Sequence, residues 1–477
     1  MTKSEETIAV DRVVKWRDLI NRKYLSDLLI LALAIWLHAA NSMLTTTIMP
    51  AAVDEIGGVS LISWAFSLYL VGSVAAACSV SLIVASFGMR RTMFWAAVVY
   101  GAGCAICAGA PNMPVMLSGR LVQGMGGGSL VAMVFVIQDR LFPNRFAPRI
   151  VAFLSMVWTT SAFCGPIIGG AFATYSSWRL AFAAFVIQAA LLCVAVLYKI
   201  RPEQAASKLD LDDFPIVRIL TIAGAVFSFS MAGYLHDPLY SALFIVTGVG
   251  LIVLFVFRDR SAGNSRLMPE RAFSLDQITG SGILMTLVFS LSMMSFLVYG
   301  PFLLIEIYQL NAFQAGLVVL MESVGWGAGA ILFSGVAPER EPVLLRVGGL
   351  FAFAGLALLT WFVPFGPLWA VVATAFLANA GFGTIWGYII KNVVGQAGTP
   401  DKDRASSIVP STQQTGFAIG ASLSGLLANS LGIELSVSVE GMQFVAFWLF
   451  AAFVPPLVVG YLLLWRFASA IRRLLTP

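Results

Sequence analysis

Residues 180–200 read LAFAAFVIQAALLCVAVLYKI, and Lys199 is the only charged residue among them. A helix of about 20 such residues crosses the hydrocarbon core of a bilayer, which is roughly 30 Å thick. Comparable apolar stretches, separated by short polar segments, recur from residue 27 to residue 465. The chain is therefore expected to cross a membrane many times.

The overall composition supports a membrane fold, because 59% of the 477 residues are hydrophobic and only 11% are charged. Barrel strands would alternate in hydrophobicity over about ten residues, whereas these stretches are continuously apolar and rich in Gly and Ala. We therefore predict an all-α membrane protein with about fourteen transmembrane helices. The predicted spans are 27–50, 60–84, 92–110, 114–138, 150–174, 180–200, 215–234, 238–257, 277–303, 312–336, 343–363, 367–391, 405–430 and 442–466.

The distribution of basic residues tests these spans, since short cytoplasmic loops collect Lys and Arg. With an even number of spans, all but two of the 29 Lys and Arg residues fall on one side of the membrane. The two exceptions are Arg120, inside a predicted helix, and Arg179, in a loop on the other side. Both termini are thus predicted to be cytoplasmic, and the net charge of +5 reflects topology rather than nucleic-acid binding.

The sequence contains no motif for an enzyme, a cofactor or a metal. There is no H-E-x-x-H, no Walker A segment and no usable Ser/His/Asp set. All five cysteines fall within predicted helices, which argues against disulfides and structural metal sites. We expect a protein that is not an enzyme and binds neither cofactor nor metal.

The polar segments divide the chain into repeated halves. The longest interior ones, near 201–214 and 258–276, bracket a helix pair, with six predicted helices on either side. Transporters are commonly built from such halves, with the binding site between them near the bilayer midplane. The predicted organisation is a cytoplasmic arm (1–26), a six-helix bundle (27–200), cytoplasmic segments with an inserted helix pair (201–276), a second six-helix bundle (277–466) and a cytoplasmic tail (467–477).

The predicted fourth helix contains RLVQGMGGG over residues 120–128. This stretch resembles the R-x-x-Q-G-x-G signature of the major facilitator superfamily. Charge inside a bilayer is costly and usually functional, and Gln123 lies on the same helix face as Arg120. Gly124 and Gly128 would let another helix approach closely. In the alternative interpretation, Arg120 only reaches the membrane interface and the glycines only pack.

Three further segments resemble the drug:proton antiporters of this superfamily. Residues 165–170, GPIIGG, resemble the end of the antiporter motif, in which Gly165, Pro166, Gly169 and Gly170 would let the fifth helix bend and slide; simple helix packing is the alternative. Ser177-Trp178-Arg179 resembles the family's S-W-R segment. The third is the Y-x-P and A-G-L stretch from Tyr299 to Leu317.

The loop between the second and third predicted helices resembles the superfamily pattern G-x-L-A-D-R-x-G-R-R. Gly88, Arg90 and Arg91 match, but Ala85 replaces the acidic residue that helps to latch the two bundles in the family. The resemblance therefore implies that other contacts control gating. Candidate replacements are Asp139 and Arg140, which are equally well explained as ordinary loop charges.

The first predicted helix carries His38 and Asn41 on one face. Asn41 falls where fourteen-helix drug antiporters have an aspartate that is implicated in proton coupling or cation recognition. Its absence argues against a carrier specialised for cationic drugs. His38 titrates near neutral pH when unperturbed, although a hydrogen-bonded structural histidine is an equal alternative.

The second half contributes the best candidate for a proton site. Glu322 lies at about the middle of the tenth predicted span, where a carboxylate must be protonated, paired or open to a water-filled cavity. A packing or hinge role is the alternative. Candidate residues of the substrate cavity, each of which has a structural alternative, are Tyr299, Trp326, Asn379, Trp386, Gln413 and Gln414.

The resemblance covers nearly the whole chain, including the extra helix pair of the fourteen-helix antiporters. It implies a secondary active transporter of small amphipathic or aromatic compounds, coupled to protons and favouring multidrug efflux. The alternatives are an importer of a planar nutrient such as the vitamin riboflavin, and a non-transporting sensor or assembly protein. We expect a monomer in the plasma (bacterial inner) membrane, with a small-molecule substrate, protons and the lipid bilayer as its partners.

Overall fold

The computed structural model describes most of the chain between residues 19 and 475. The predicted cytoplasmic arm and the first interior loop lie mainly outside the described residues. Within 19–475 the residues not described are 20, 22, 144–145, 203–215, 236, 262–271, 273, 276, 397–401 and 437, together with the side chains of 81, 139, 147–148, 402–408 and 475.

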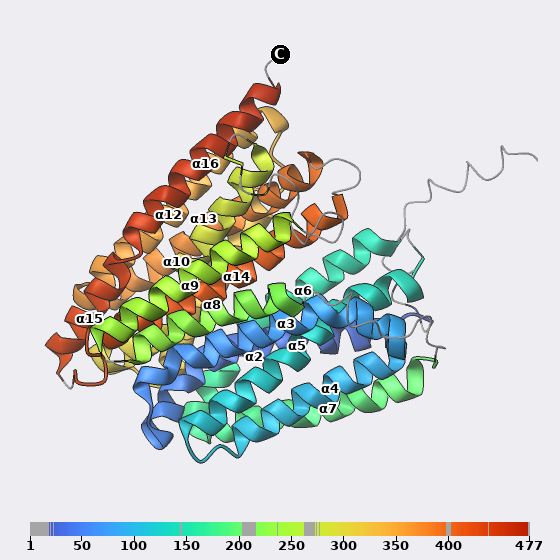
Figure 1. The fold of residues 1–477 in the computed structure, drawn as a ribbon, viewed down its shortest axis with the longest axis horizontal. Coiled ribbons are helices and arrows are strands. Elements are labelled where there is room, and N and C mark those ends of the chain that lie inside the picture. Colours follow the sequence, from blue (N-terminus) through green and yellow to red (C-terminus); the bar gives the residue numbers. More distant parts are fainter. Residues whose placement is uncertain are drawn as a thin grey trace, which may run out of the picture.

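Over the described ranges the secondary structure is helical, without a strand. Six helices form an N-terminal bundle, two form an inserted pair, and the remaining seven form a C-terminal bundle (Figure 1). The N-terminal bundle contains α2 (Leu25–Ile56), α3 (Ile62–Phe87), α4 (Met89–Ala108), α5 (Met113–Leu141), α6 (Ala147–Tyr175) and α7 (Trp178–Lys199). The inserted pair is α8 (Ile216–Tyr234) and α9 (Pro238–Arg260). The C-terminal bundle contains α10 (Ile278–Tyr308), α11 (Ala312–Leu332), α12 (Glu341–Phe365), α13 (Leu368–Gln396), α14 (Lys402–Ser430), α15 (Val439–Ala451) and α16 (Val454–Leu475).

Thirteen segments of the described chain are long and apolar enough to cross a membrane, which confirms a multi-pass membrane protein. The pair α15–α16 counts as one of these segments. The additional helix α14 has 29 residues but is not among the thirteen, because polar residues such as Gln413 and Gln414 lower its hydropathy. The chain thus has about the predicted number of spans.

The last predicted span, 442–466, is wrong as a single helix. The structure ends α15 at Ala451 and starts α16 at Val454, directly before Pro455 and Pro456. Proline has no backbone N–H to donate and its ring clashes with the preceding turn, so two prolines in an apolar run interrupt the helix. The helix α16 then continues to Leu475, beyond the predicted end of the span.

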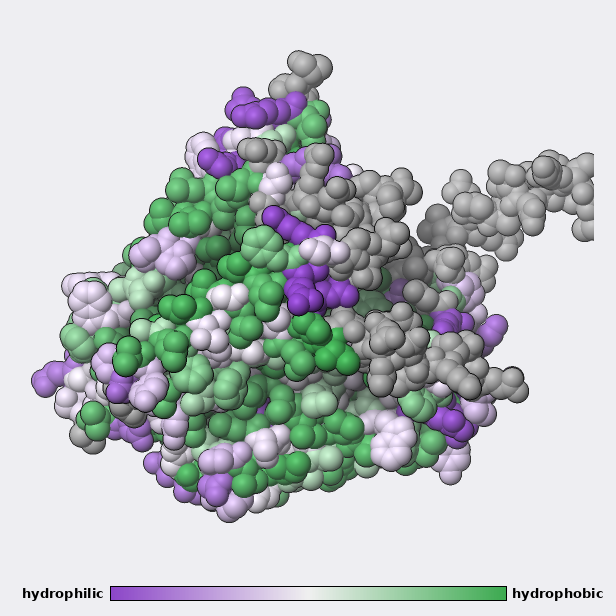
Figure 2. Space-filling model, in the orientation of Figure 1, coloured by the Kyte–Doolittle hydropathy of each residue, from purple (hydrophilic) through white to green (hydrophobic). Residues whose placement is uncertain are grey.

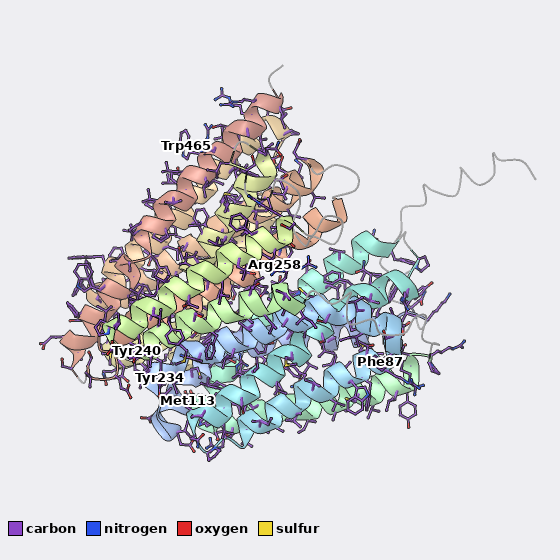
Figure 3. The ribbon with its side chains drawn as sticks, viewed as in Figure 1. Phe87, Met113, Tyr234, Tyr240, Arg258 and Trp465 are labelled. Atoms are coloured by element: carbon purple, nitrogen blue, oxygen red, sulfur yellow. The ribbon has the colours of Figure 1, made fainter. Side chains whose placement is uncertain are left out.

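The two ends of the molecule differ, because α5, α7 and α9 carry basic residues in their last turns at one end and several helices start with a side-chain cap at the other. Phe87 and Arg258 lie toward one end, here called the basic end, and Met113, Tyr234 and Tyr240 lie at the other, here called the capped end (Figure 3). Five of the helices that start at the capped end begin with a side chain that accepts a backbone N–H bond, which satisfies part of the first turn. These caps are Asn112, Ser177, Asp237, Asn311 and Ser438.

The two bundles meet near the capped end. Asn429 Nδ2 donates to the Ser60 carbonyl at 2.8 Å, and Phe313 N donates to Thr174 Oγ1 at 3.0 Å. A third cross-bundle bond, from Ser323 Oγ to the Ala162 carbonyl, lies deeper in the membrane. Toward the basic end the ribbons of the two bundles diverge, so that the molecule has a V shape (Figure 1). These contacts run along two seams, α6 with α11 and α3 with α14.

The inserted pair covers one of these seams. The helix α8 packs on α14 and α3, while α9 packs mainly on α8. Ser422 on α14 bonds the hydroxyls of Ser67 on α3 and Ser230 on α8, at 2.9 and 2.8 Å. Apolar side chains cover the visible face over α8 and α9, and hydrophilic residues gather near the ends (Figure 2). Such a face suits contact with lipid.

Candidate functional site

In the N-terminal bundle a buried polar cluster surrounds Arg120, which is only 1% exposed. From α5 its Nη1 donates to Asn41 Oδ1 on α2 at 2.7 Å and to Gln123 Oε1 on its own helix. Its Nε donates to the Ala65 carbonyl on α3 at 3.0 Å. The guanidinium therefore joins three helices in the middle of this bundle.

Two aromatic rings and a histidine extend this cluster. The guanidinium lies 4.2 Å from the centre of the Tyr69 ring, and the Tyr69 hydroxyl lies 2.9 Å from His38 Nδ1. His38 in turn packs edge-on against Trp158 of α6. We call Arg120, Asn41, Gln123, Tyr69 and His38 the arginine cluster. The structure thus brings together the four residues that sequence analysis chose for this region, and Tyr69 is the member that it missed.

The arginine cluster contains a positive charge without an acidic partner. The ion pairs found among the described side chains join other residues: Arg179 with Glu55, Arg218 with Asp259, and Lys391 with Glu341. Among the described residues, the groups found in contact with the guanidinium are polar oxygens and the Tyr69 ring. In addition, Asn41 Nδ2 is buried and has no hydrogen-bond partner. Asn41 occupies the position that resembles the antiporter aspartate, and it gives Arg120 a neutral amide where an aspartate would give a negative charge.

Glycines make the close approach of α3, α4 and α5 possible. A Cβ at Gly124 would overlap the Tyr69 carbonyl, and a Cβ at Gly128 would overlap the Ser73 carbonyl. A Cβ at Gly126 would overlap the Tyr100 backbone on α4. The Gly-rich run beside Arg120 is therefore required for packing, and it also sets the distance between Arg120 and its partners.

The C-terminal bundle holds a different polar site around Glu322. On α11, Glu322 Oε1 accepts a bond of 3.1 Å from Asn379 Nδ2 on α13. Asn379 is buried and also donates to the Ala375 carbonyl, whereas Glu322 keeps part of its surface exposed. No ion pair of Glu322 with a described cation is found. One amide is therefore the identified hydrogen-bond donor to this carboxylate.

Trp326, one turn along α11 from Glu322, belongs to a group of three aromatic rings. The Trp326 ring lies 5.0 Å from the Phe382 ring and 6.0 Å from the Trp386 ring, and Phe382 stacks on Trp386 at 5.7 Å. Trp326 and Trp386 are partly exposed. We call Glu322, Asn379 and these three rings the glutamate site. Sequence analysis chose all of these residues except Phe382, which looked like one more core residue of an apolar helix.

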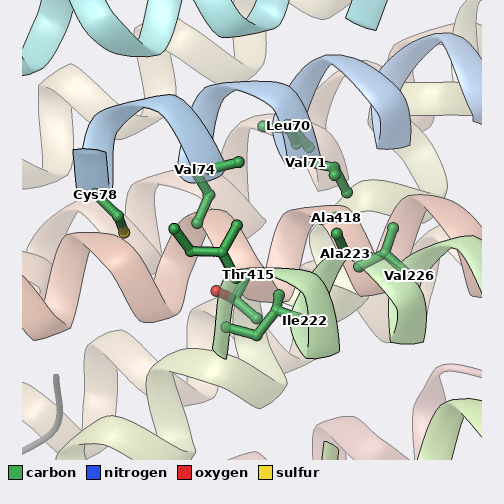
Figure 4. A pocket seen from close by; sticks show the side chains of 11 residues that line it. Leu70, Val71, Val74, Cys78, Ile222, Ala223, Val226, Thr415 and Ala418 are labelled. Carbon is green, nitrogen blue, oxygen red and sulfur yellow. The ribbon is translucent and has the colours of Figure 1, made fainter. Parts of the chain in front are cut away.

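The other proposed cavity residues lie elsewhere. Gln413 and Gln414 are partly buried on α14. Tyr299 is fully buried on α10, and its hydroxyl is 3.7 Å from a Cβ built on Gly425 at the α3–α14 seam. The same seam holds a small apolar hollow of ≈ 20 Å³ between α3, α8 and α14, with Thr415 and Cys78 among its walls (Figure 4). This hollow is too small for an organic substrate.

The proposed packing and gating residues fall into two groups. Gly165, Gly169 and Gly170 lie against other helices, and the last of them would place a Cβ 2.7 Å from the Ala312 carbonyl across the bundle seam. The Pro166 carbonyl faces Gly316 at the same seam. The segment of Pro166 therefore forms part of the α6–α11 contact.

At the basic end, Gly88 has a φ of 79° between α3 and α4, a conformation that favours glycine. Arg90 is partly buried and Arg91 is exposed, both in the first turn of α4. Arg140 is exposed in the last turn of α5, and the side chain of Asp139 is outside the described residues. The latch role of these residues stays a prediction.

Sequence analysis missed an ion pair at the basic end of the C-terminal bundle. Glu341, which starts α12, is 2% exposed, and its carboxylate lies 2.7 Å from Lys391 Nζ on α13. Asn392 donates to the other oxygen of the same carboxylate. A second missed carboxylate, Glu55, accepts a bond from Trp178 and pairs with Arg179 at the capped end. Sequence analysis could not recognise either carboxylate, because both lie at helix ends and their partners are distant in sequence.

A family model described as Major Facilitator Superfamily matches residues 31–400. A protein of Mycobacterium tuberculosis named "Probable multidrug-efflux transporter" is 26% identical over 437 residues, which cover 87% of this chain and 90% of the relative. An MFS-type transporter of Penicillium citrinum is 25% identical over 69% of this chain and 58% of its own length.

Solved structures of transporters share the fold. A bacterial homologue of the human lysosomal transporter Spinster, in an inward-facing and unoccupied conformation, superposes with a TM-score of 0.68 at 11% identity, over 94% of this chain and 98% of its own. A D-xylose–proton symporter gives a TM-score of 0.64 at 15% identity, over 93% and 97% of the two chains.

The helices define a multi-pass membrane protein, and its two-bundle arrangement is a fold that solved transporters share. With more than half of its length matched by the family model, the chain belongs to the Major Facilitator Superfamily, and it is a transporter rather than an enzyme.

Proposed function

We propose that this transporter uses a proton gradient to export small amphipathic or aromatic organic compounds. The observation that carries the proposal is the glutamate site, in which a carboxylate deep in the membrane span has a single identified amide donor and three aromatic rings nearby. A charged carboxylate is costly to enclose, so a change in its surroundings favours gain or loss of a proton. Aromatic faces beside it suit planar substrates.

The proposed mechanism is alternating access between the two bundles. Contacts of Gly170 with Ala312 and of Asn429 with Ser60 hold the bundles together near the capped end, while the ribbons diverge at the basic end. Because basic loops favour the cytoplasmic side, we assign the basic end to the cytoplasm and infer that this conformation opens inward. Rocking about the α6–α11 and α3–α14 seams would then open the opposite side. A bacterial inner membrane and a monomeric state are parts of this proposal.

The direction of transport rests on the relatives. Those in Mycobacterium tuberculosis carry the name of a multidrug-efflux transporter and align over most of this chain. The missing carboxylate at Asn41 distinguishes this protein from a carrier specialised for cations, so neutral or weakly charged aromatic compounds are the proposed substrates.

The test is uptake by proteoliposomes that contain the purified protein under an imposed pH gradient. A lipophilic dye and riboflavin are offered separately, with and without a protonophore. The proposal expects dye movement against its own gradient, abolished when the protonophore dissipates the pH gradient. Dye movement that does not depend on the proton gradient would refute the proposed coupling of transport to protons. Movement of riboflavin alone would replace the export function with a nutrient carrier.

A further inference from the structure

A groove lies on the outside of the N-terminal bundle. It has a volume of ≈ 740 Å³ and is walled by α3, α4, α5 and α8, with no residue from the C-terminal bundle. It is therefore separate from the glutamate site. A volume of this size falls within the range of about 300–1,000 Å³ that holds a small organic ligand.

The groove is about as long as one membrane leaflet is thick. It runs along α3 from Phe87 at the basic end to Ala75, and along α4 from Arg91 to Val99. Figure 3 labels Phe87 at its outer limit. The twelve helical steps from Ala75 to Phe87 correspond to about 18 Å at 1.5 Å per residue. One leaflet of a hydrocarbon core of roughly 30 Å is about 15 Å thick. The length of the groove thus matches a single lipid chain.

The walls of the groove are apolar and accessible from outside. Trp95, Met125 and Leu220, which belong to α4, α5 and α8, are all exposed large hydrophobic residues. The hydroxyls of Ser79, Thr92 and Ser129 are among the few polar groups in the lining. The first two of these hydroxyls already donate to carbonyls of their own helices. The interior of the groove thus offers little to a polar ligand.

Charge is concentrated at the mouth of the groove. Arg91, in the first turn of α4, lines the groove and is exposed. Its guanidinium has no ion-pair or hydrogen-bond partner among the described residues. A free cation at the depth of the headgroups, beside an apolar channel of one leaflet, matches a ligand with an anionic head and an acyl chain. Basic pockets on the cytoplasmic side of membrane helices recognise such headgroups.

We propose that this groove is a binding site for an anionic phospholipid, with the phosphate of the lipid at Arg91 and one acyl chain between α3, α4 and α8. The groove lies between α8 of the inserted pair and α4 of the N-terminal bundle. In the described part of the chain, α4 and α8 are not among the helix pairs that pack closely against each other. The lipid would fill this space.

The test measures which lipids stay bound to the purified protein in native mass spectra, after exchange into mild detergent with phosphatidylglycerol or phosphatidylcholine. Wild type is expected to retain phosphatidylglycerol at least several-fold better. Arg91→Ala is expected to lose this preference and Arg91→Lys to keep much of it. The matched control is Arg473→Ala, which removes another exposed arginine near the basic end without touching the groove.

Two groove-filling variants, Ser79→Trp and Val99→Phe, test the acyl-chain part. Both side chains line the groove and are partly exposed, so at least one variant is expected to fold, as judged by a single peak in size-exclusion chromatography. Each folded variant should lower retention of both lipids. The proposal is overturned if Arg91→Ala keeps the wild-type preference or if the filled groove retains lipid normally. Normal lipid retention with reduced dye uptake would instead make the groove a substrate entrance.

Discussion

In the N-terminal bundle Arg120 is fully enclosed, whereas in the C-terminal bundle Glu322 is partly exposed. Arg120 is 1% exposed and has hydrogen bonds to three different helices, while Glu322 is partly exposed and has one identified donor. Arginine stays protonated in proteins, whereas a carboxylate changes charge over an accessible pH range. The two bundles therefore suit different tasks.

The Arg120 guanidinium keeps its charge and its partners, whereas the Glu322 carboxylate can change its charge. A guanidinium held by several acceptors resists movement, and each acceptor would be left unpaired without it. The single Asn379 bond at Glu322 is weaker and easier to exchange for water or substrate. We therefore expect substitutions in the arginine cluster to act mainly on stability, and those in the glutamate site to act mainly on transport.

The largest expected effect is that of Arg120→Ala. The change leaves the Asn41 and Gln123 oxygens and the Ala65 carbonyl without their donor in a buried site. Each unpaired buried group costs about 1–3 kcal/mol, so the three together predict a total loss of about 3–9 kcal/mol of stability, measured as a lower melting temperature in detergent. Transport should also fall. A wild-type melting temperature would contradict the structural role of Arg120.

The charge-preserving control is Arg120→Lys. Lysine keeps the positive charge but replaces the planar fork by a single ammonium group, so it cannot reach all three acceptors in the same geometry. It should melt between the wild type and the alanine variant. Equal melting of the lysine and alanine variants would show that the hydrogen-bond geometry, and not the charge, stabilises the cluster.

The second effect concerns Glu322→Gln. The amide has nearly the same size as the carboxylate, so we expect a melting temperature close to that of wild type and a loss of at least about tenfold in proton-driven uptake. The matched control is Glu306→Gln, on α10 near the capped end, which should transport normally. Unchanged uphill uptake in Glu322→Gln would exclude this residue as the coupling site.

Much of the fold followed from hydropathy and charge. The predicted span 180–200 corresponds to α7, Trp178–Lys199, and 238–257 corresponds to α9, Pro238–Arg260. These boundaries could be predicted because long apolar runs end at polar caps or basic residues. The break between α15 and α16 was missed, because hydropathy reports a continuous apolar run even where two prolines interrupt the backbone.

The contacts within the candidate sites could be predicted only where the residues share one helix. Arg120 and Gln123 lie three positions apart, so their contact follows from helix geometry. The bond between Glu322 and Asn379 joins residues 57 positions apart, and it depends on how α11 packs against α13. Tyr69 and Glu341 were missed for the same reason, since nothing in their local sequence marks their partners.

The third effect concerns Asn41→Asp, which would give the N-terminal bundle a carboxylate within the membrane span, as Glu322 gives one to the C-terminal bundle. Asn41→Asp places a carboxylate beside the unneutralised guanidinium and removes the buried Asn41 Nδ2 that has no partner. We expect a higher melting temperature, equivalent to about 1 kcal/mol, because a donor without a partner disappears and an opposite charge is added. Uptake of cationic dyes should rise relative to neutral ones. A lower melting temperature would mean that burying the new charge outweighs the pairing.

The smallest effects are expected at the aromatic rings, and they decide whether substrate touches both bundles. Trp386→Ala removes one stacked ring of the glutamate site, and an aromatic contact contributes about 0.5–1.5 kcal/mol, so the half-saturating concentration of a planar substrate should rise about three- to tenfold. The matched control is Trp361→Ala, on the exposed face of α12, which should leave the half-saturating concentration unchanged.

The companion variant is Trp158→Ala, which removes the ring that packs against His38 in the other bundle. If substrate binds only at the glutamate site, this variant should bind normally, in contrast to Trp386→Ala. Equal weakening in both variants would place the substrate between the bundles, against the arginine cluster as well as the glutamate site. The division into a fixed arginine cluster and a changeable glutamate site would then fail for binding, because a substrate that contacts Trp158 would also sense the charge of Arg120 through His38 and Tyr69.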